Sequence, residues 1–202
     1  MWIRRAATLI PAERGKMKEV WELCRRLNNP TRLKLLMDVY SPHLNDGLNV
    51  EIAMDDNSLK QSATSSHLAA LASLGIIRRC RSGRFVNYYP EISDESPNVA
   101  EIAGLIRERG RRDSCNLAFA DVFPVMMNAF RAKAVANIAL TDGITLLELA
   151  EKYDKEMRLV TRDLKPAVEG GLLSVSAEGP DGIYAYIPPA DPIARRIVEL
   201  SA

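Results

Sequence analysis

The feature that most constrains the fold of this chain is an internal repeat at about half of its 202 residues. The segment NPTRLKLLMDV at 29–39 aligns with NAFRAKAVANI at 128–138, and HLAALASLGII at 67–77 aligns with DLKPAVEGGLL at 163–173. GRFVNYYP at 83–90 also resembles GIYAYIP at 182–188, so the offset drifts only from about 99 to 96 and back to about 98–99. Such a repeat predicts two copies of one structural unit.

The first copy begins with a pattern of three helices. Apolar residues recur at helical spacing in 17–27. Pro30 suits the first turn of a second helix over 30–40. A shorter helix is expected around 50–54.

A fourth helix and a strand pair follow. Ser58 and Gln61 are spaced as a capping box, and Ser62 offers a slightly later cap. Leu68 provides part of a buried stripe, and Gly75 is placed to end the helix. The segments IIRRCR and RFVNYY, joined at a Ser-Gly turn, predict a hairpin.

Helices followed by a hairpin in this order predict a winged helix-turn-helix unit, whose hairpin is called the wing. We therefore expect a chain that is mainly α with small β-hairpin wings (α+β), a tandem winged helix-turn-helix. The expected divisions are an N-terminal extension (1–15), a winged-helix DNA-binding domain (16–95), a connecting helix (96–113) and a second winged-helix-like domain (114–202). Met17 offers an alternative translation start.

Short polar side chains gather where the fourth helix begins. A helix fits the major groove of DNA, and polar groups near its N-terminus can hydrogen-bond to base edges. Gln61 suits a bidentate contact with adenine, whereas hydroxyl groups can equally bind phosphate. The alternative is that these polar side chains only face solvent at the start of a helix, which would give the same composition. The candidate DNA-binding residues of this helix are Lys60, Gln61, Ser62, Thr64, Ser65 and Ser66.

The predicted wing carries four arginines within seven residues, with no acidic residue among them: Arg78, Arg79, Arg81 and Arg84. Because alternate strand residues share a face, Arg79 and Arg81 should point one way and Arg78 the other. Such a cluster repels itself unless an anion meets it, and phosphate is the obvious partner. The alternative is a basic hairpin that only faces solvent.

The segments LCRRLNNPTRLKLL and LKQSATSSHLAALASLGIIRRCRSGRFVNYY resemble the ArsR-type family of winged-helix repressors. The resemblance rests on the Pro30-Thr31-Arg32 helix start, the Thr64-x-x-His67-Leu68 pattern and the Leu74-Gly75-Ile76-Ile77 step into the wing. It covers roughly residues 17–92 and implies DNA binding, usually as a two-fold dimer. Its metal-sensing members carry cysteines in the helix before the recognition helix, or His and carboxylates on the terminal helix.

Metal, redox and catalytic chemistry find little support in the sequence. The segment NVEIAMDD, where such cysteines would lie, has no Cys or His, so we expect no metal site. His67 is expected to make a local structural hydrogen bond, and Cys24 to lie in the core. Cys80 among arginines suits a reactive thiolate, which leaves redox sensing open. No nucleophile or phosphate-loop motif is present, so we expect neither an enzyme nor a cofactor.

Charge, cysteine spacing and apolar run length indicate the kind of protein and its setting. Residues 1–100 carry a net charge of +3 and residues 101–202 a net charge of -2, although the whole chain is close to neutral at +1. Three widely spaced cysteines fit a reducing, cytoplasmic setting. No run approaches the roughly 18 apolar residues that a membrane span needs, so no membrane partner is expected.

The second copy differs at the positions that would meet DNA. Its predicted wing, SVSAEGPDGIYAY, has two acids and no base, and Pro166 should kink its recognition helix. We therefore expect a packing or partner-binding role, with weak backbone contact left open. The secondary DNA-contact candidates are Lys155, Arg158, Arg162 and Lys165.

These features together favour a sequence-specific, double-stranded-DNA-binding transcriptional regulator of the ArsR-like repressor type. A homodimer is expected, through the helices at 17–27 and 98–110, unless the fused second unit replaces the missing partner. The alternative is a winged-helix module for protein interaction or architecture, in which DNA binding is weak or incidental. The sequence identifies no small-molecule effector.

Overall fold

The computed structural model describes residues 20–42, 47–177 and 179–201. These residues form a mainly helical structure with two small antiparallel three-stranded sheets, so the predicted α+β class is confirmed. After a helical segment at 20–27, the first half contains α2 (Pro30–Tyr40), β1 (Leu48–Asn49), α3 (Val50–Asn57), α4 (Gln61–Ser73), β2 (Arg78–Ser82), β3 (Phe85–Tyr89) and α5 (Pro97–Arg112). The second half contains η1 (Ala118–Val122), α6 (Phe123–Met126), α7 (Ala129–Ala139), β4 (Ile144–Thr145), α8 (Leu146–Tyr153), α9 (Met157–Glu169), β5 (Leu173–Val175), β6 (Ile183–Tyr186) and α10 (Pro192–Glu199).

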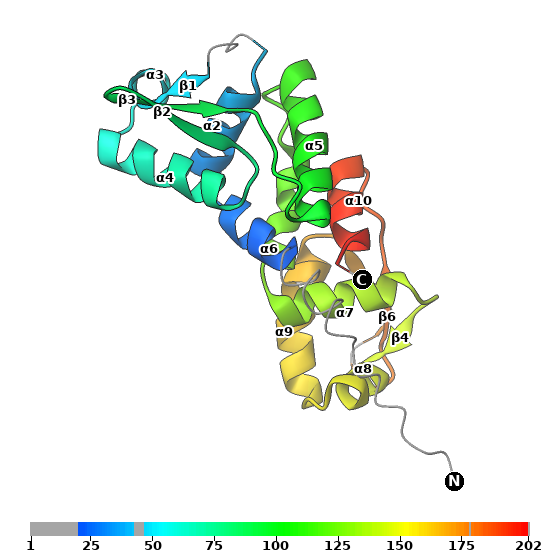
Figure 1. Cartoon of the computed structure of the whole chain (residues 1–202). Helices are drawn as coiled ribbons and strands as arrows, with labels where there is room; N and C mark the ends of the chain where they lie inside the picture. Colours follow the sequence, from blue (N-terminus) through cyan, green and yellow to red (C-terminus); the bar gives the residue numbers. More distant parts are fainter. Residues whose placement is uncertain (1–19, 43–46, 178, 202) are drawn as a thin grey trace.

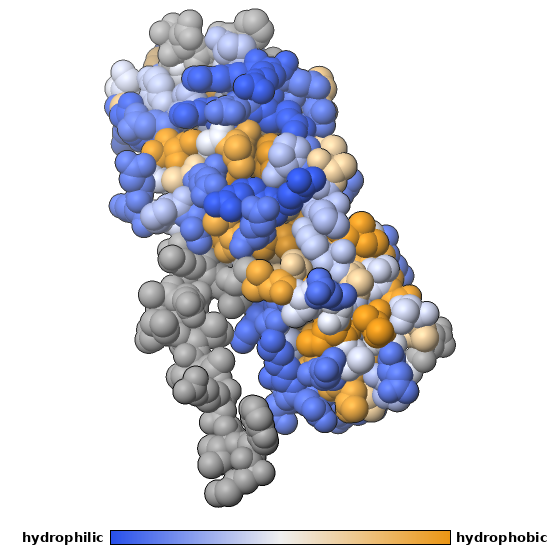
Figure 2. Space-filling view, turned by 90° about the vertical axis from the view of Figure 1, so that its right-hand side faces the viewer, coloured by the Kyte–Doolittle hydropathy of each residue, from blue (hydrophilic) through white to orange (hydrophobic). Residues whose placement is uncertain are grey.

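The elements form two lobes (Figure 1). The upper lobe contains α2 to α4 with the first sheet, and the lower lobe contains α7 to α9 with the second. Helices α5 and α10 lie side by side where the lobes meet. Figure 2 shows a largely hydrophilic upper end, while apolar residues reach the surface at the middle and over the lower lobe.

The two sheets have the same topology and register. Their strand orders are β1-β3-β2 and β4-β6-β5. Arg79 pairs with Tyr88 in the first sheet, and Val175 pairs with Tyr184 in the second, so equivalent residues are 96 positions apart. The expected offset of 98–99 in the wing is therefore wrong. Short apolar and aromatic segments can be aligned by composition at several offsets, whereas the hydrogen bonds between paired strands define a single offset.

Helices α2 and α7 begin in the same way. The side-chain oxygen of Asn29 accepts a hydrogen bond from the backbone N–H of Arg32 at 2.8 Å. That of Asn128 accepts one from Arg131 at 2.9 Å. Each asparagine satisfies a backbone donor that the first turn leaves without a partner. This repeated cap explains why the asparagines recur 99 residues apart.

Helix α4 begins without a side-chain cap, and the expected capping box is absent. Ser58 adopts a left-handed backbone conformation (φ 52°) that ends α3, so it cannot also cap α4. The residue at the N-terminal boundary of α4 is Lys60, whose side chain accepts no hydrogen bond. The first N–H groups of α4 therefore remain open to an outside acceptor.

Apolar residues of both lobes form one continuous core. Val20, Leu23, Cys24 and Leu27 of the first helical segment are buried in it, which confirms the expectation for Cys24. Burial raises the pKa of the Cys24 thiol.

The junction between the lobes brings equivalent residues together. Asn28 Nδ2 donates to Met127 Sδ at 3.0 Å, and these residues directly precede the equivalent caps of α2 and α7. Helices α5 and α10 both have Pro at their first position, and these prolines are 95 residues apart. The same offset relates Glu101 to Arg196, and these two residues form an ion pair at 2.6 Å. In a two-fold dimer, residues on the axis contact their own counterparts. The halves thus meet, at these two contacts, as the subunits of a symmetric dimer do.

Candidate nucleic-acid interface

The N-terminal turns of α4 present polar side chains to solvent. Five of the six expected residues are exposed: Lys60, Gln61, Ser62, Ser65 and Ser66. The opposite face of the helix packs into the core through Leu68 and Leu71, which are fully buried. Because the first N–H groups have no side-chain cap, this end also offers backbone donors and the positive end of the helix dipole.

Thr64 is the exception, and its inclusion among the DNA-binding residues is wrong. It is fully buried, and its hydroxyl donates to the backbone oxygen of Lys60 at 3.2 Å. Thr64 precedes Leu68 by four residues and Leu71 by seven, so all three lie on one face of α4. The helical period, rather than the polarity of the side chain, decides where Thr64 points.

The β2–β3 hairpin divides its arginines between two faces, as alternation predicts. Arg79 lies opposite the buried Tyr88, whereas Arg78 lies opposite Tyr89. Arg78 makes an ion pair with Glu91 at 2.6 Å and stacks over the Tyr89 ring at 5.2 Å. The sequence cluster is therefore partly neutralised by an acid that follows the hairpin.

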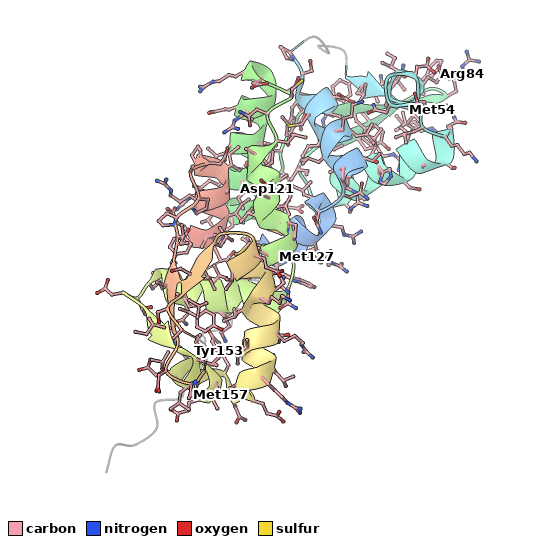
Figure 3. All side chains as sticks on the ribbon, turned by 180° about the vertical axis from the view of Figure 1, so that it is seen from behind. Met54, Arg84, Asp121, Met127, Tyr153 and Met157 are labelled. Carbon is pink, nitrogen blue, oxygen red and sulfur yellow. The ribbon has the colours of Figure 1, made fainter. Side chains whose placement is uncertain are left out.

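Arg79, Arg81 and Arg84 are exposed and have no carboxylate partner among the described residues. Arg81 Nε donates to the Gly83 carbonyl at 3.2 Å, and the Arg84 guanidinium lies 4.9 Å from the Phe85 ring centre. Figure 3 shows Arg84 projecting at the outer end of the upper lobe. Three exposed cations that form no ion pair among the described residues are suited to bind phosphate.

A hollow of about 370 Å³ joins the two parts of the interface. Gln61, Ser62 and Ser65 of α4 line it together with Arg84 from the hairpin turn. The remaining lining residues, which the sequence pattern did not single out, are Asn49, Val50, Glu51, Phe85 and Val86. The exposed start of α4 and the tip of the hairpin therefore form one continuous surface.

His67 of α4 is half-buried. No hydrogen bond to it is found among the described residues, so the expected structural hydrogen bond is not seen there. Burial, and then the charge of Arg32, lower the pKa of its imidazole. The neutral form is thus favoured.

The cations expected to make secondary DNA contacts are all paired with carboxylates. Lys155 and Arg162 contact Asp163 at 3.0 and 3.1 Å. Arg158 contacts Glu156 at 2.5 Å, and Lys165 lies 3.6 Å from Glu169. Helix α9 also runs through Pro166 from Met157 to Glu169 without interruption. None of these four candidates is therefore an unpaired cation like Arg79, Arg81 and Arg84 of the first lobe.

No family model, curated protein or solved structure matches the chain. Among the described residues, no three His, Cys, Asp or Glu side chains are grouped so that they could hold a metal ion. Within the same residues, every helix is too short or too polar to cross a membrane.

Proposed function

We propose that this protein is a sequence-specific DNA-binding transcriptional regulator, built as a tandem winged helix-turn-helix and similar to the ArsR-type repressors. Each half has the order helix, short strand, two helices, hairpin and closing helix, which supports the winged-helix interpretation. In this proposal α4 enters the major groove and the β2–β3 wing binds the flanking phosphates.

The observation that carries the proposal is the combined surface of α4 and the wing. Exposed hydrogen-bonding groups of Gln61, Ser62 and Ser65 share one hollow with Arg84. Arg79 and Arg81 add two exposed cations on the same hairpin. Base-reading groups beside phosphate-binding cations are what direct DNA readout requires.

The salt dependence of DNA affinity tests the proposal. Replacing Arg79 and Arg81 together by alanine should weaken binding to all sequences and flatten the log–log salt slope by up to about two units. The control is the double replacement of the exposed Arg111 and Arg112 by alanine, which removes the same charge at the end of α5. No binding at low salt, or equal effects of the two double variants, would contradict the proposal.

A protein-interaction module remains the second candidate, and the second lobe favours it. Its four candidate DNA contacts are each paired with a carboxylate, so its α9 region offers no counterpart of the unpaired arginines in the first hairpin. A chain in which only this function operates would show no salt-dependent DNA binding.

A further inference from the structure

The second lobe has a groove where the first lobe has its candidate interface. The groove has a volume of about 630 Å³ and lies between α9, the start of α8 and the β5–β6 hairpin. The offset of 96 residues relates Gln61 to Met157, Ser65 to Thr161 and Arg84 to Pro180, and all of these residues line their respective hollows. The same position in the fold is therefore hollow in both lobes.

The lining of this groove is mainly apolar. Leu146 and Tyr184 line it and are almost fully buried. Met157 and Val175 also line it, yet they remain 39% and 41% exposed. Their counterparts in the first lobe are Gln61 and Arg79, so an amide and a cation are replaced by apolar side chains. Large apolar groups left exposed in a hollow indicate a site for an apolar partner.

Among the residues that the structure describes, a range that leaves out position 178, the charged residues lining the groove are all basic: Arg158, Arg162 and Lys165. Their side chains are 70–80% exposed. Their carboxylate partners, Glu156, Asp163 and Glu169, are not among the lining residues. Because exposed ion pairs contribute only about 0.2–1 kcal/mol, a bound anion can compete for these cations.

We propose that this groove binds a small amphipathic carboxylate, a carboxylic acid with an aliphatic or aromatic body. The apolar lining would cover the body, and the cations of α9 would meet the carboxylate. The volume lies within the roughly 300–1,000 Å³ typical of small-molecule sites. All lining residues belong to one lobe, so the site needs no second chain.

Decanoate is a suitable probe, used with the full chain. It should displace the fluorescent apolar anion 8-anilinonaphthalene-1-sulfonate from the protein. Decyltrimethylammonium has the same apolar body and a positive head, and it should bind at least about tenfold more weakly, a difference of roughly 1.4 kcal/mol. Arg162→Glu should reduce this preference for the anion. Failure of decanoate to bind, or equal affinity for both head groups, would overturn the proposal.

A matched pair of variants locates the site. Thr161→Trp places a large side chain in the groove and should weaken decanoate binding at least about tenfold. Ser65→Trp makes the same change at the counterpart position and should leave decanoate binding unchanged. Both residues are exposed on helices, and circular dichroism melting checks that both variants fold. Equal loss in the two variants would overturn the assignment.

The test is independent of DNA binding. Ser65→Trp should weaken DNA binding while Thr161→Trp should not, so a failure of the DNA proposal is seen separately from a failure of this one. Light scattering tests whether a second copy of the chain, rather than a carboxylate, occupies the groove. A wild-type dimer that Thr161→Trp converts to a monomer would mean that a second copy fills the groove, and it would overturn the proposal.

Discussion

At the scale of single residues, exposure separates the groups that we propose to read DNA from those that hold the helix in place. Gln61 is exposed at the first position of α4, whereas Thr64 is fully buried one turn later. Gln61→Ala should relax the preference at one base pair by roughly 1–3 kcal/mol, because the amide suits adenine. Selection of bound fragments from a random DNA pool measures this preference.

Thr64→Val is the control for the Gln61 prediction. It removes the hydroxyl with little change in shape, and the Lys60 oxygen keeps its hydrogen bond from the Thr64 backbone N–H at 3.0 Å. Base preference should therefore stay unchanged, while stability changes by about 1 kcal/mol or less. If Thr64→Val alters base preference and Gln61→Ala does not, the assigned roles are reversed.

The ion pair between Arg78 and Glu91 leads to a second residue-scale prediction. Glu91→Gln should release Arg78, which would raise DNA affinity at low salt and steepen the salt slope by up to about one unit. Glu95→Gln removes the same charge from the same loop, where no ion pair to Glu95 is found among the described residues, and should have a smaller effect. The prediction is wrong if Arg78→Ala fails to remove the gain of Glu91→Gln.

The exposure of the candidate interface residues was largely predictable from sequence, but their contacts within the chain were not. Alternation along the strand correctly separated Arg78 from Arg79. The pairing of Arg78 with Glu91 depends on how the chain leaves the hairpin, which local pattern does not encode. The polarity of Thr64 alone suggests an exposed contact, whereas its spacing from Leu68 places it on the buried face of α4.

At the scale of elements, the repeated asparagine caps should contribute equally to stability. Asn29→Ala and Asn128→Ala should each lower the free energy of unfolding by about 1 kcal/mol, because each leaves a backbone donor without its acceptor. Asn29→Ser and Asn128→Ser, which keep an oxygen acceptor, should lose much less. Denaturant titration measures all four variants, and equal losses for alanine and serine would exclude the capping explanation.

The longer elements were predictable because their patterns are long enough to show a period. The helix expected at 30–40 matches α2, and the connecting helix expected at 96–113 contains α5. Strands β1 and β4 were missed because two residues cannot show alternation. Helix α10 was also missed, although Asp191-Pro192 and the apolar spacing after it could have indicated a helix.

At the scale of the whole molecule, the surfaces expected to form a homodimer are covered within the chain. Val20, Leu23 and Leu27 are buried, as are Ile102 and Ile106 of α5. Helix α10 of the second lobe packs on α5, which leads us to propose that the second lobe takes the place of a partner subunit while lacking unpaired cations on α9. We therefore expect a monomer that selects one asymmetric DNA motif. Recovery of palindromic sequences from the random pool, with a dimer in light scattering, would contradict this.

The pseudo-symmetric junction can be tested by exchanging charges between equivalent positions. Arg196→Glu opposes two carboxylates and should lower the free energy of unfolding by on the order of 1 kcal/mol. Glu101→Arg together with Arg196→Glu should restore the part of this loss that comes from position 101, because that pair again has opposite charges, while Glu199 still opposes the new carboxylate at position 196. Arg195→Glu, on the same helix but bonded to the Pro189 carbonyl, is the matched control.

The ion pair between Glu101 and Arg196 also determines how the stability of the protein changes with pH. The hydrogen bond from Arg196 lowers the pKa of Glu101 from its usual value of 4.5. Because the folded state binds this proton more weakly than the unfolded state, the stabilisation is present above pH 4.5 and is lost as pH falls through the lowered pKa. Glu101→Gln should therefore flatten the dependence of stability on pH in acid. An unchanged acid profile in Glu101→Gln would mean that this ion pair does not contribute to the stability.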